Sequence, residues 1–134
     1  MNISLKNNYV SSLTLEKIQG KRDVEKTDKF TLSYNGSSDR RSPKEFKITF
    51  DIELSDNRSI ELKVQYVSVF STDEDVNEEF MTGPFAKINA PAIGYPFLRS
   101  YISTLTINSG FPPIILPTIN FVKLSKEDKE QKPE

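Results

Sequence analysis

The sequence predicts an α+β fold in which a four-stranded antiparallel sheet packs with one main helix. Residues 46–54 alternate strictly between apolar and polar side chains, and residues 60–66 repeat the alternation beyond a polar turn at 55–58, as in a hairpin with one buried face. Weaker alternation at 30–34 and at 3–18 predicts two further strands. A helical repeat in the second half supplies the layer that covers the sheet.

The main helix is predicted over residues 90–108. Its apolar side chains recur at helical spacing, Asn89 is placed to cap the first turn ahead of Pro91, and Gly110 supplies a stop. Pro96 lies inside this helix and removes a backbone donor, which predicts a kink or an irregular start in the first two turns.

The segments around the helix have distinct compositions. The acidic stretch 73–79 predicts a short helix or turn, and the three prolines within 111–117 require an extended chain. Residues 125–134 are almost all charged and are expected to be a disordered tail. The 134-residue chain is therefore expected to form one domain over residues 1–124, followed by that tail.

Composition narrows the function classes. The chain has no Cys and no His, which removes thiolate and imidazole catalysis and nearly all zinc sites, so we expect no catalytic residue, no metal and no cofactor. A net charge of −1 argues against nucleic acid as a partner, and no apolar run is long enough to insert in a membrane. Residues 1–20 show no apolar signal core, so a cytoplasmic location is expected. The apolar share of 36% is low enough to favour a homo-oligomer.

Two segments carry a family resemblance. Ala90–Arg99, APAIGYPFLR, resembles the helix start Cys-Pro-x-x-x-Phe-Pro-Tyr-Ala-Arg of the SecB protein-export chaperones. Phe111–Phe121, FPPIILPTINF, resembles their segment Phe-Pro-x-Leu-x-Leu-Ala-Pro-Val-Asn-Phe. The likeness covers residues 2–122 and fails beyond them, so the family's second, C-terminal helix is expected to be short or absent.

The resemblance implies an ATP-independent holdase that binds unfolded polypeptides and keeps preproteins competent for translocation. A dedicated chaperone that protects an antitoxin in a toxin–antitoxin module is the first alternative, and a non-chaperone structural or regulatory oligomer is the second. The resemblance also implies a dimer or a dimer of dimers, a homotetramer. The expected interface residues are Tyr9, Phe97, Tyr101, Ile102 and Leu105.

The resemblance assigns an exposed client-binding groove to apolar and aromatic side chains of the strands and of the stretch before the helix. These are Leu32, Tyr34, Leu62, Val64, Tyr66, Phe70, Phe80 and Phe85. Alternation alone favours the core for any single strand residue, whereas the resemblance favours the groove for the aligned set, so both interpretations stand at this point. For docking of the SecA ATPase, only Glu16 retains the acidic character of the family, because Ser12 and Lys63 occupy two other aligned positions.

Overall fold

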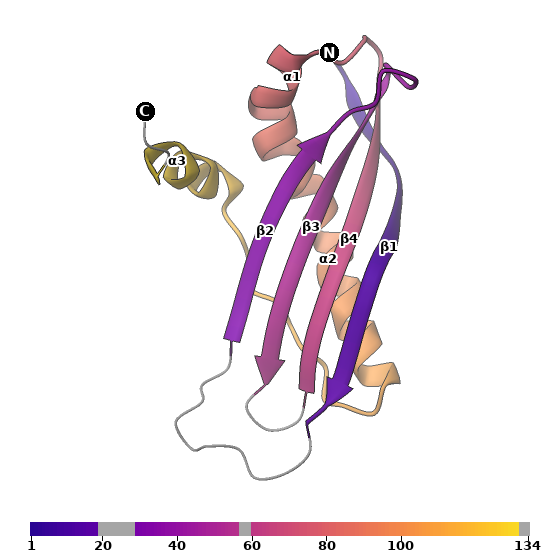
Figure 1. The fold of residues 1–134 in the computed structure, drawn as a ribbon, viewed down its shortest axis with the longest axis vertical. Coiled ribbons are helices and arrows are strands. Elements are labelled where there is room, and N and C mark those ends of the chain that lie inside the picture. The colour runs from indigo at the N-terminus through magenta and orange to yellow at the C-terminus, as the bar shows by residue number, and fades with distance from the viewer. Residues whose placement is uncertain (19–28, 57–59, 132–134) are drawn as a thin grey trace.

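The computed structural model describes residues 1–18, 29–56 and 60–131 (Figure 1). The elements in chain order are β1 (Ile3–Lys17), β2 (Lys29–Ser37), β3 (Glu45–Asp56), β4 (Ile60–Thr72), α1 (Glu78–Thr82), the π-helical turn η1 (Phe85–Asn89), α2 (Ala90–Asn108) and α3 (Phe121–Gln131). The predicted fold class, a four-stranded antiparallel sheet with one main helix, is confirmed. Residues 57 and 58 of the predicted hairpin turn lie outside the described residues, as do residues 132–134.

The four strands form one sheet in the order β1-β4-β3-β2, with every pairing antiparallel. β3 and β4 are therefore the central strands, and β1 and β2 form the two edges. β1 is the irregular strand, since its register with β4 shifts between Leu5 and Asn7 and again between Val10 and Ser12. Such bulges sharpen the local twist of an edge strand.

The core lies between one face of the sheet and α2, which crosses behind the strands in the view of Figure 1. The buried apolar side chains that β3 and β4 turn to this core are Phe46, Ile48, Phe50, Ile52, Leu54, Leu62, Val64, Tyr66 and Phe70. The helix comes closest to the sheet at Gly94. A Cβ atom added to Gly94 would lie 2.5 Å from the Ser68 Oγ atom and 3.2 Å from Phe50 Cε2. Glycine at this position therefore sets the distance between the two layers.

The main helix has the bounds predicted for it, but its start differs. Asn89 has helical dihedral angles and makes no capping hydrogen bond through its side chain. The predicted N-cap at Asn89 is therefore wrong, because η1 leads directly into α2 and leaves no free first turn to cap. The capping asparagine is Asn77 at the start of α1, where its Oδ1 atom accepts a hydrogen bond from the Phe80 amide at 2.8 Å. At the other end, Gly110 follows α2 with a φ of 90°.

The second, C-terminal helix is present and short, as predicted, and it occupies part of the segment that was expected to be a disordered tail from residue 125. α3 has 11 residues and extends to Gln131. The Asn120 side chain caps it by accepting the Lys123 amide at 3.1 Å. Phe121 packs edge-on against the rings of Tyr34 and Tyr95, with centroids 5.4 and 5.6 Å apart. This anchored first turn explains why a charged sequence is helical here.

Candidate functional site

An apolar groove opens at the surface between the sheet and the proline-rich segment, which we define as residues 111–120. Its volume is about 240 Å³. The apolar groove is lined by Phe30 and Leu54 from the sheet, by Ile114, Ile115, Leu116 and Pro117 from the segment, and by Lys29, Ser55 and Asp56 at its rim. Ile115 is 67% exposed. Exposed aliphatic surface of this kind is typical of a site that receives another apolar group.

The proline-rich segment returns along α2 toward α3 (Figure 1). Side chains of α2 hold it, because three of its carbonyl groups accept hydrogen bonds from Tyr95, Arg99 and Ser103. The segment carries prolines at three positions, which have no backbone N–H and cannot take part in a strand ladder as donors. One wall of the apolar groove is therefore built on side-chain contacts.

An aromatic surface, separate from the apolar groove, lies at the other end of the molecule, near α1 and η1. The rings of Phe46 and Phe70 stack at 5.1 Å, and Phe80 packs edge-on against Phe46 at the same distance. Phe85 stacks on Phe80 at 6.0 Å and reaches the surface. The aromatic series thus leads from the core to solvent.

The residues predicted to line a client groove fall into two groups. Phe85 is exposed, whereas Leu32, Tyr34 and Phe80 are half-buried. The other four, Leu62, Val64, Tyr66 and Phe70, are buried in the protomer. Their placement on an exposed groove wall is corrected here, because α2 covers this face of the central strand β4. Burial also raises the pKa of Tyr66, with a smaller contribution from Tyr101.

Sequence reasoning missed the residues of the apolar groove itself. Phe30 and Leu54 were assigned only to strands, and residues 114–117 only to an extended chain. The available signal was the run of aliphatic residues between prolines, since a segment of this composition cannot form a helix or a central strand.

The predicted interface residues are also divided. Tyr9 and Phe97 are exposed, and Tyr101 and Leu105 are half-buried. Ile102 is fully buried against the sheet, so its assignment to an interface is corrected. Ile93 and Ile107, which were not among the predicted interface residues, are exposed on the same helix as Phe97. The outward face of α2 is thus uncharged and combines these apolar side chains with Ser100 and Thr104, because Arg99 is the single charged residue of α2 and binds the proline-rich segment.

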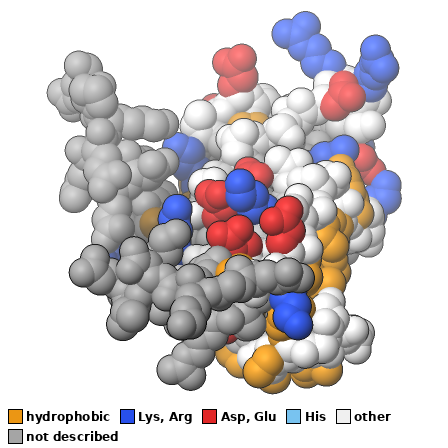
Figure 2. All heavy atoms as spheres, turned by 60° about the horizontal axis from the view of Figure 1, so that its bottom comes forward, with side chains coloured by type: hydrophobic (Ala, Val, Ile, Leu, Met, Phe, Trp, Pro, Cys, Tyr) orange, Lys and Arg blue, Asp and Glu red, His pale blue; other side chains and the backbone are white. Residues whose placement is uncertain are grey.

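Part of the face of the sheet that points away from α2 is polar, whereas Val67 and Val69 lie buried on the same face. A hollow of about 430 Å³ lies over it, lined by Ser12, Thr14, Thr31, Ser33, Asp51, Glu53, Lys63 and Gln65 among others. The Lys63 ammonium lies 3.2 Å from Glu53, and Gln65 donates to Asp51 at 3.0 Å. Figure 2 shows acidic and basic side chains gathered side by side, with a band of hydrophobic side chains next to them. Glu16 is exposed near the end of β1, opposite Glu61 of β4.

Within the described ranges, no three acidic side chains are grouped closely enough to hold a metal ion. In the same part of the chain, no helix combines the length and the apolar character needed to cross a bilayer.

The two-layer fold places the chain among small α+β proteins with a four-stranded antiparallel sheet covered by one main helix. It belongs to the SecB family, since the family profile described as preprotein translocase subunit SecB matches residues 1–132.

Relatives support this membership. An uncharacterized protein of Methanocaldococcus jannaschii is 31% identical over 119 residues, which cover 82% of this chain and 76% of the relative. The protein-export protein SecB of Afipia carboxidovorans is 26% identical over 133 residues, covering 94% of this chain and 81% of the relative.

A solved structure shares the fold. The SecB-like chaperone of Mycobacterium tuberculosis, determined in complex with a ChAD peptide from the HigA1 antitoxin, superposes with a TM-score of 0.68 at 15% identity. The match covers 87% of this chain and 90% of that one.

Proposed function

We propose that this protein is a holdase that captures extended apolar segments of non-native polypeptides in the apolar groove, without nucleotide. The observation that carries the proposal is the groove itself, whose aliphatic wall is held in place yet open to solvent at Ile115. Apolar contacts are non-directional, so such a surface accepts many sequences. The proposal includes preproteins among the clients, in keeping with the export function named in the family.

Suppression of aggregation tests the proposal. The wild-type protein should keep several unrelated unfolded proteins soluble without ATP. Ile115→Asp should weaken this activity at least several-fold, because a carboxylate in the groove must be desolvated before an apolar client can bind. Thr14→Asp is the matched control, since it adds the same charge to an exposed site on the polar face of the sheet. Equal activity of both variants would remove the groove as the client site.

A dedicated antitoxin chaperone is the second candidate, and the mycobacterial complex with an antitoxin peptide favours it. The two candidates differ in breadth. A generalist should protect several unrelated clients, whereas a dedicated chaperone should protect one antitoxin and leave the others to aggregate. A purely structural or regulatory oligomer, the remaining alternative, should protect none.

We further propose that the protein works as a homo-oligomer, a dimer or a dimer of dimers, that associates through α2 and β1. The uncharged outward face of α2, with Phe97 48% exposed and Ile107 54% exposed, supports this proposal, as does the exposed edge residue Tyr9. Light scattering at micromolar concentration should give a mass of at least a dimer. Phe97→Asp should lower that mass, whereas Ser100→Ala on the same helix should leave it unchanged.

SecA is expected to bind weakly. The ammonium of Lys63 stands where a cationic partner would need a carboxylate, although Glu53 partly neutralises it at 3.2 Å. Glu16 is the acidic residue that remains from the family pattern. Calorimetry with the zinc-loaded C-terminal peptide of SecA should show no tight binding, and submicromolar affinity would contradict this expectation.

A further inference from the structure

One face of α2 carries a row of polar side chains that we call the α2 seam: Tyr95, Arg99, Ser103 and Thr106. Their spacing of four, four and three residues places them on one side of the helix. The Tyr95 hydroxyl donates to the Pro117 carbonyl at 2.7 Å, and Arg99 Nε donates to the Leu116 carbonyl at 3.1 Å.

The C-terminal half of the α2 seam, Ser103 and Thr106, binds both the carbonyl and the amide group of Ile114. Ser103 Oγ donates to the Ile114 carbonyl at 3.0 Å, while Thr106 Oγ1 accepts the Ile114 amide at 3.0 Å. Thr106 is fully buried and its hydroxyl donates back to the Ile102 carbonyl at 2.9 Å. The proline-rich segment thus runs antiparallel to α2, with Ile114 and Pro117 at the two ends of the contact.

The residues held by the seam are the same residues that form one wall of the apolar groove, namely 114–117. An extended proline-rich chain has no internal hydrogen bonds, so its position against the rest of the molecule depends on outside partners. Here the polar partners are four side chains of one helix, and the buried side chain of Leu116 anchors the segment in the core. The position of the wall relative to Phe30 and Leu54 therefore depends on the seam.

We propose that the α2 seam is a positioning device that sets the width of the apolar groove and so determines how tightly clients are held. This inference rests on the proposed function at the same groove. A wall fixed in advance spares the client the entropic cost of ordering it, so a loosened wall should appear as faster client release. Tyr95, Arg99, Ser103 and Thr106 are positioning residues in this scheme, because they act through the backbone of the segment.

The test uses the full chain and a labelled unstructured peptide rich in Leu and Phe. Tyr95→Phe combined with Ser103→Ala removes two seam donors, while the Tyr95 ring keeps its packing on Phe50 and Phe121. The double variant should bind the peptide about tenfold more weakly, mainly through faster dissociation. Hydrogen exchange at the Ile114 amide, which donates to Thr106 Oγ1, should accelerate, whereas exchange in β3 and β4 should not.

Two controls separate a positioning role from a merely structural one. Ser103→Thr keeps a hydroxyl donor and should restore affinity when combined with Tyr95→Phe, relative to the alanine version. Ser100→Ala, exposed on the same helix, should bind as the wild type does. Should the double variant unfold, the two single variants decide, each with an expected loss of about threefold.

The outcomes distinguish this inference from the proposed function. If the wild type binds the peptide and Ile115→Asp does not, but the double variant binds like the wild type despite faster exchange, the seam has no positioning role and the holdase proposal stands. If the wild type does not bind the peptide at all, the proposed function fails and the inference with it.

Discussion

The β3–β4 hairpin and the proline-rich segment are both extended chains, yet they are held in opposite ways. β3 is bonded along both sides by backbone pairing with β2 and β4, and its apolar face is fully covered. The proline-rich segment relies on side chains of α2 and leaves Ile115 in solvent. In the hairpin, the apolar surface is buried and stabilises the fold. In the proline-rich segment, part of the apolar surface stays available to a client.

The largest expected effect is on stability: a charge introduced in the hairpin should unfold the protein, whereas the same charge in the proline-rich segment should not. Leu62 is 1% exposed, so Leu62→Asp places a carboxylate in the core and should cost more than about 4 kcal/mol, enough to unfold a small domain. Ile115→Asp adds the same charge to an exposed site and should change the free energy of unfolding by less than about 0.5 kcal/mol. Circular dichroism melts of the two variants make the comparison directly. A folded Leu62→Asp protein would mean that this face of β4 is not core.

The next effect concerns the distance between helix and sheet. Gly94→Ala gains up to about 1 kcal/mol in helix propensity but forces a Cβ atom against Ser68 and Phe50. Overpacking of this kind costs about 1–3 kcal/mol, so we expect net destabilisation of about 1–2 kcal/mol. Chemical denaturation should show it. Adding Ser68→Ala removes the closest atom, the Oγ 2.5 Å from the new Cβ, and the double variant should be more stable than the sum of the two single changes predicts.

A smaller effect appears at alkaline pH. Burial raises the pKa of Tyr95 from its ordinary value of 10.0 to about 12, with Arg99 opposing the shift. Because the neutral phenol is favoured in the folded state, its stability contribution is fully present below pH 10 and is lost as pH rises toward about 12. Thermal midpoints of the wild type should therefore fall over this range. Tyr95→Phe has no phenol to ionise and should show a flatter decline, whereas an equal slope would contradict the assigned cause.

The sequence was sufficient to predict the strands and the main helix, because their periodicities are distinct and their ends carry turn residues. It could not decide what covers the apolar face of β4. Alternation indicates that one face of the strand is shielded from water. Leu62 and Tyr66 would show the same pattern whether α2 or a client covers that face.

The helix posed a similar difficulty. α2 has almost no charged residues, so polarity did not mark which side faces the sheet, and Ile102 was assigned outward although it is buried. The α2 seam was equally hidden, since Tyr95 and Ser103 are ordinary helical residues until their carbonyl partners are known. For α3, the charged composition predicted disorder. The anchoring of Phe121 could not be predicted from the sequence, because it depends on tertiary contacts with Tyr34 and Tyr95.

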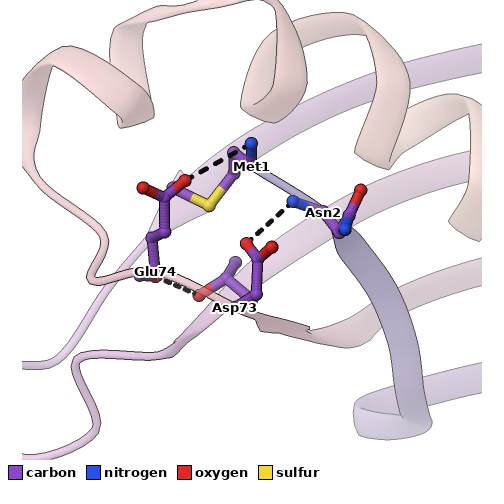
Figure 3. Close-up of polar contacts among 5 residues, drawn as sticks. Met1, Asn2, Asp73 and Glu74 are labelled. Carbon is purple, nitrogen blue, oxygen red and sulfur yellow. Dashed lines mark hydrogen bonds and ion pairs between the residues drawn. The ribbon is translucent and has the colours of Figure 1, made fainter.

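The smallest expected effect tests whether side chains hold a second piece of extended chain. At the start of β1, the Asp73 carboxylate accepts the Asn2 amide at 2.8 Å, and the Met1 amino group lies 3.3 Å from Glu74 (Figure 3).

The Asn2 hydrogen bond is the main cause that lowers the pKa of Asp73. A carboxyl group with a lowered pKa contributes stability that is present above its ordinary pKa of 3.8 and is lost as pH falls through the folded value. Asp73 is exposed, so Asp73→Ala, which removes the acceptor of the Asn2 amide, should barely change the global melt. It should instead lower the hydrogen-exchange protection of the Asn2 and Ile3 amides at neutral pH, and acidification should lower the same protection in the wild type once rates are divided by the intrinsic rate at each pH. If exchange at these amides is equally slow in both proteins, backbone pairing with β4 alone holds the end of β1, and holding by side chains is confined to the proline-rich segment.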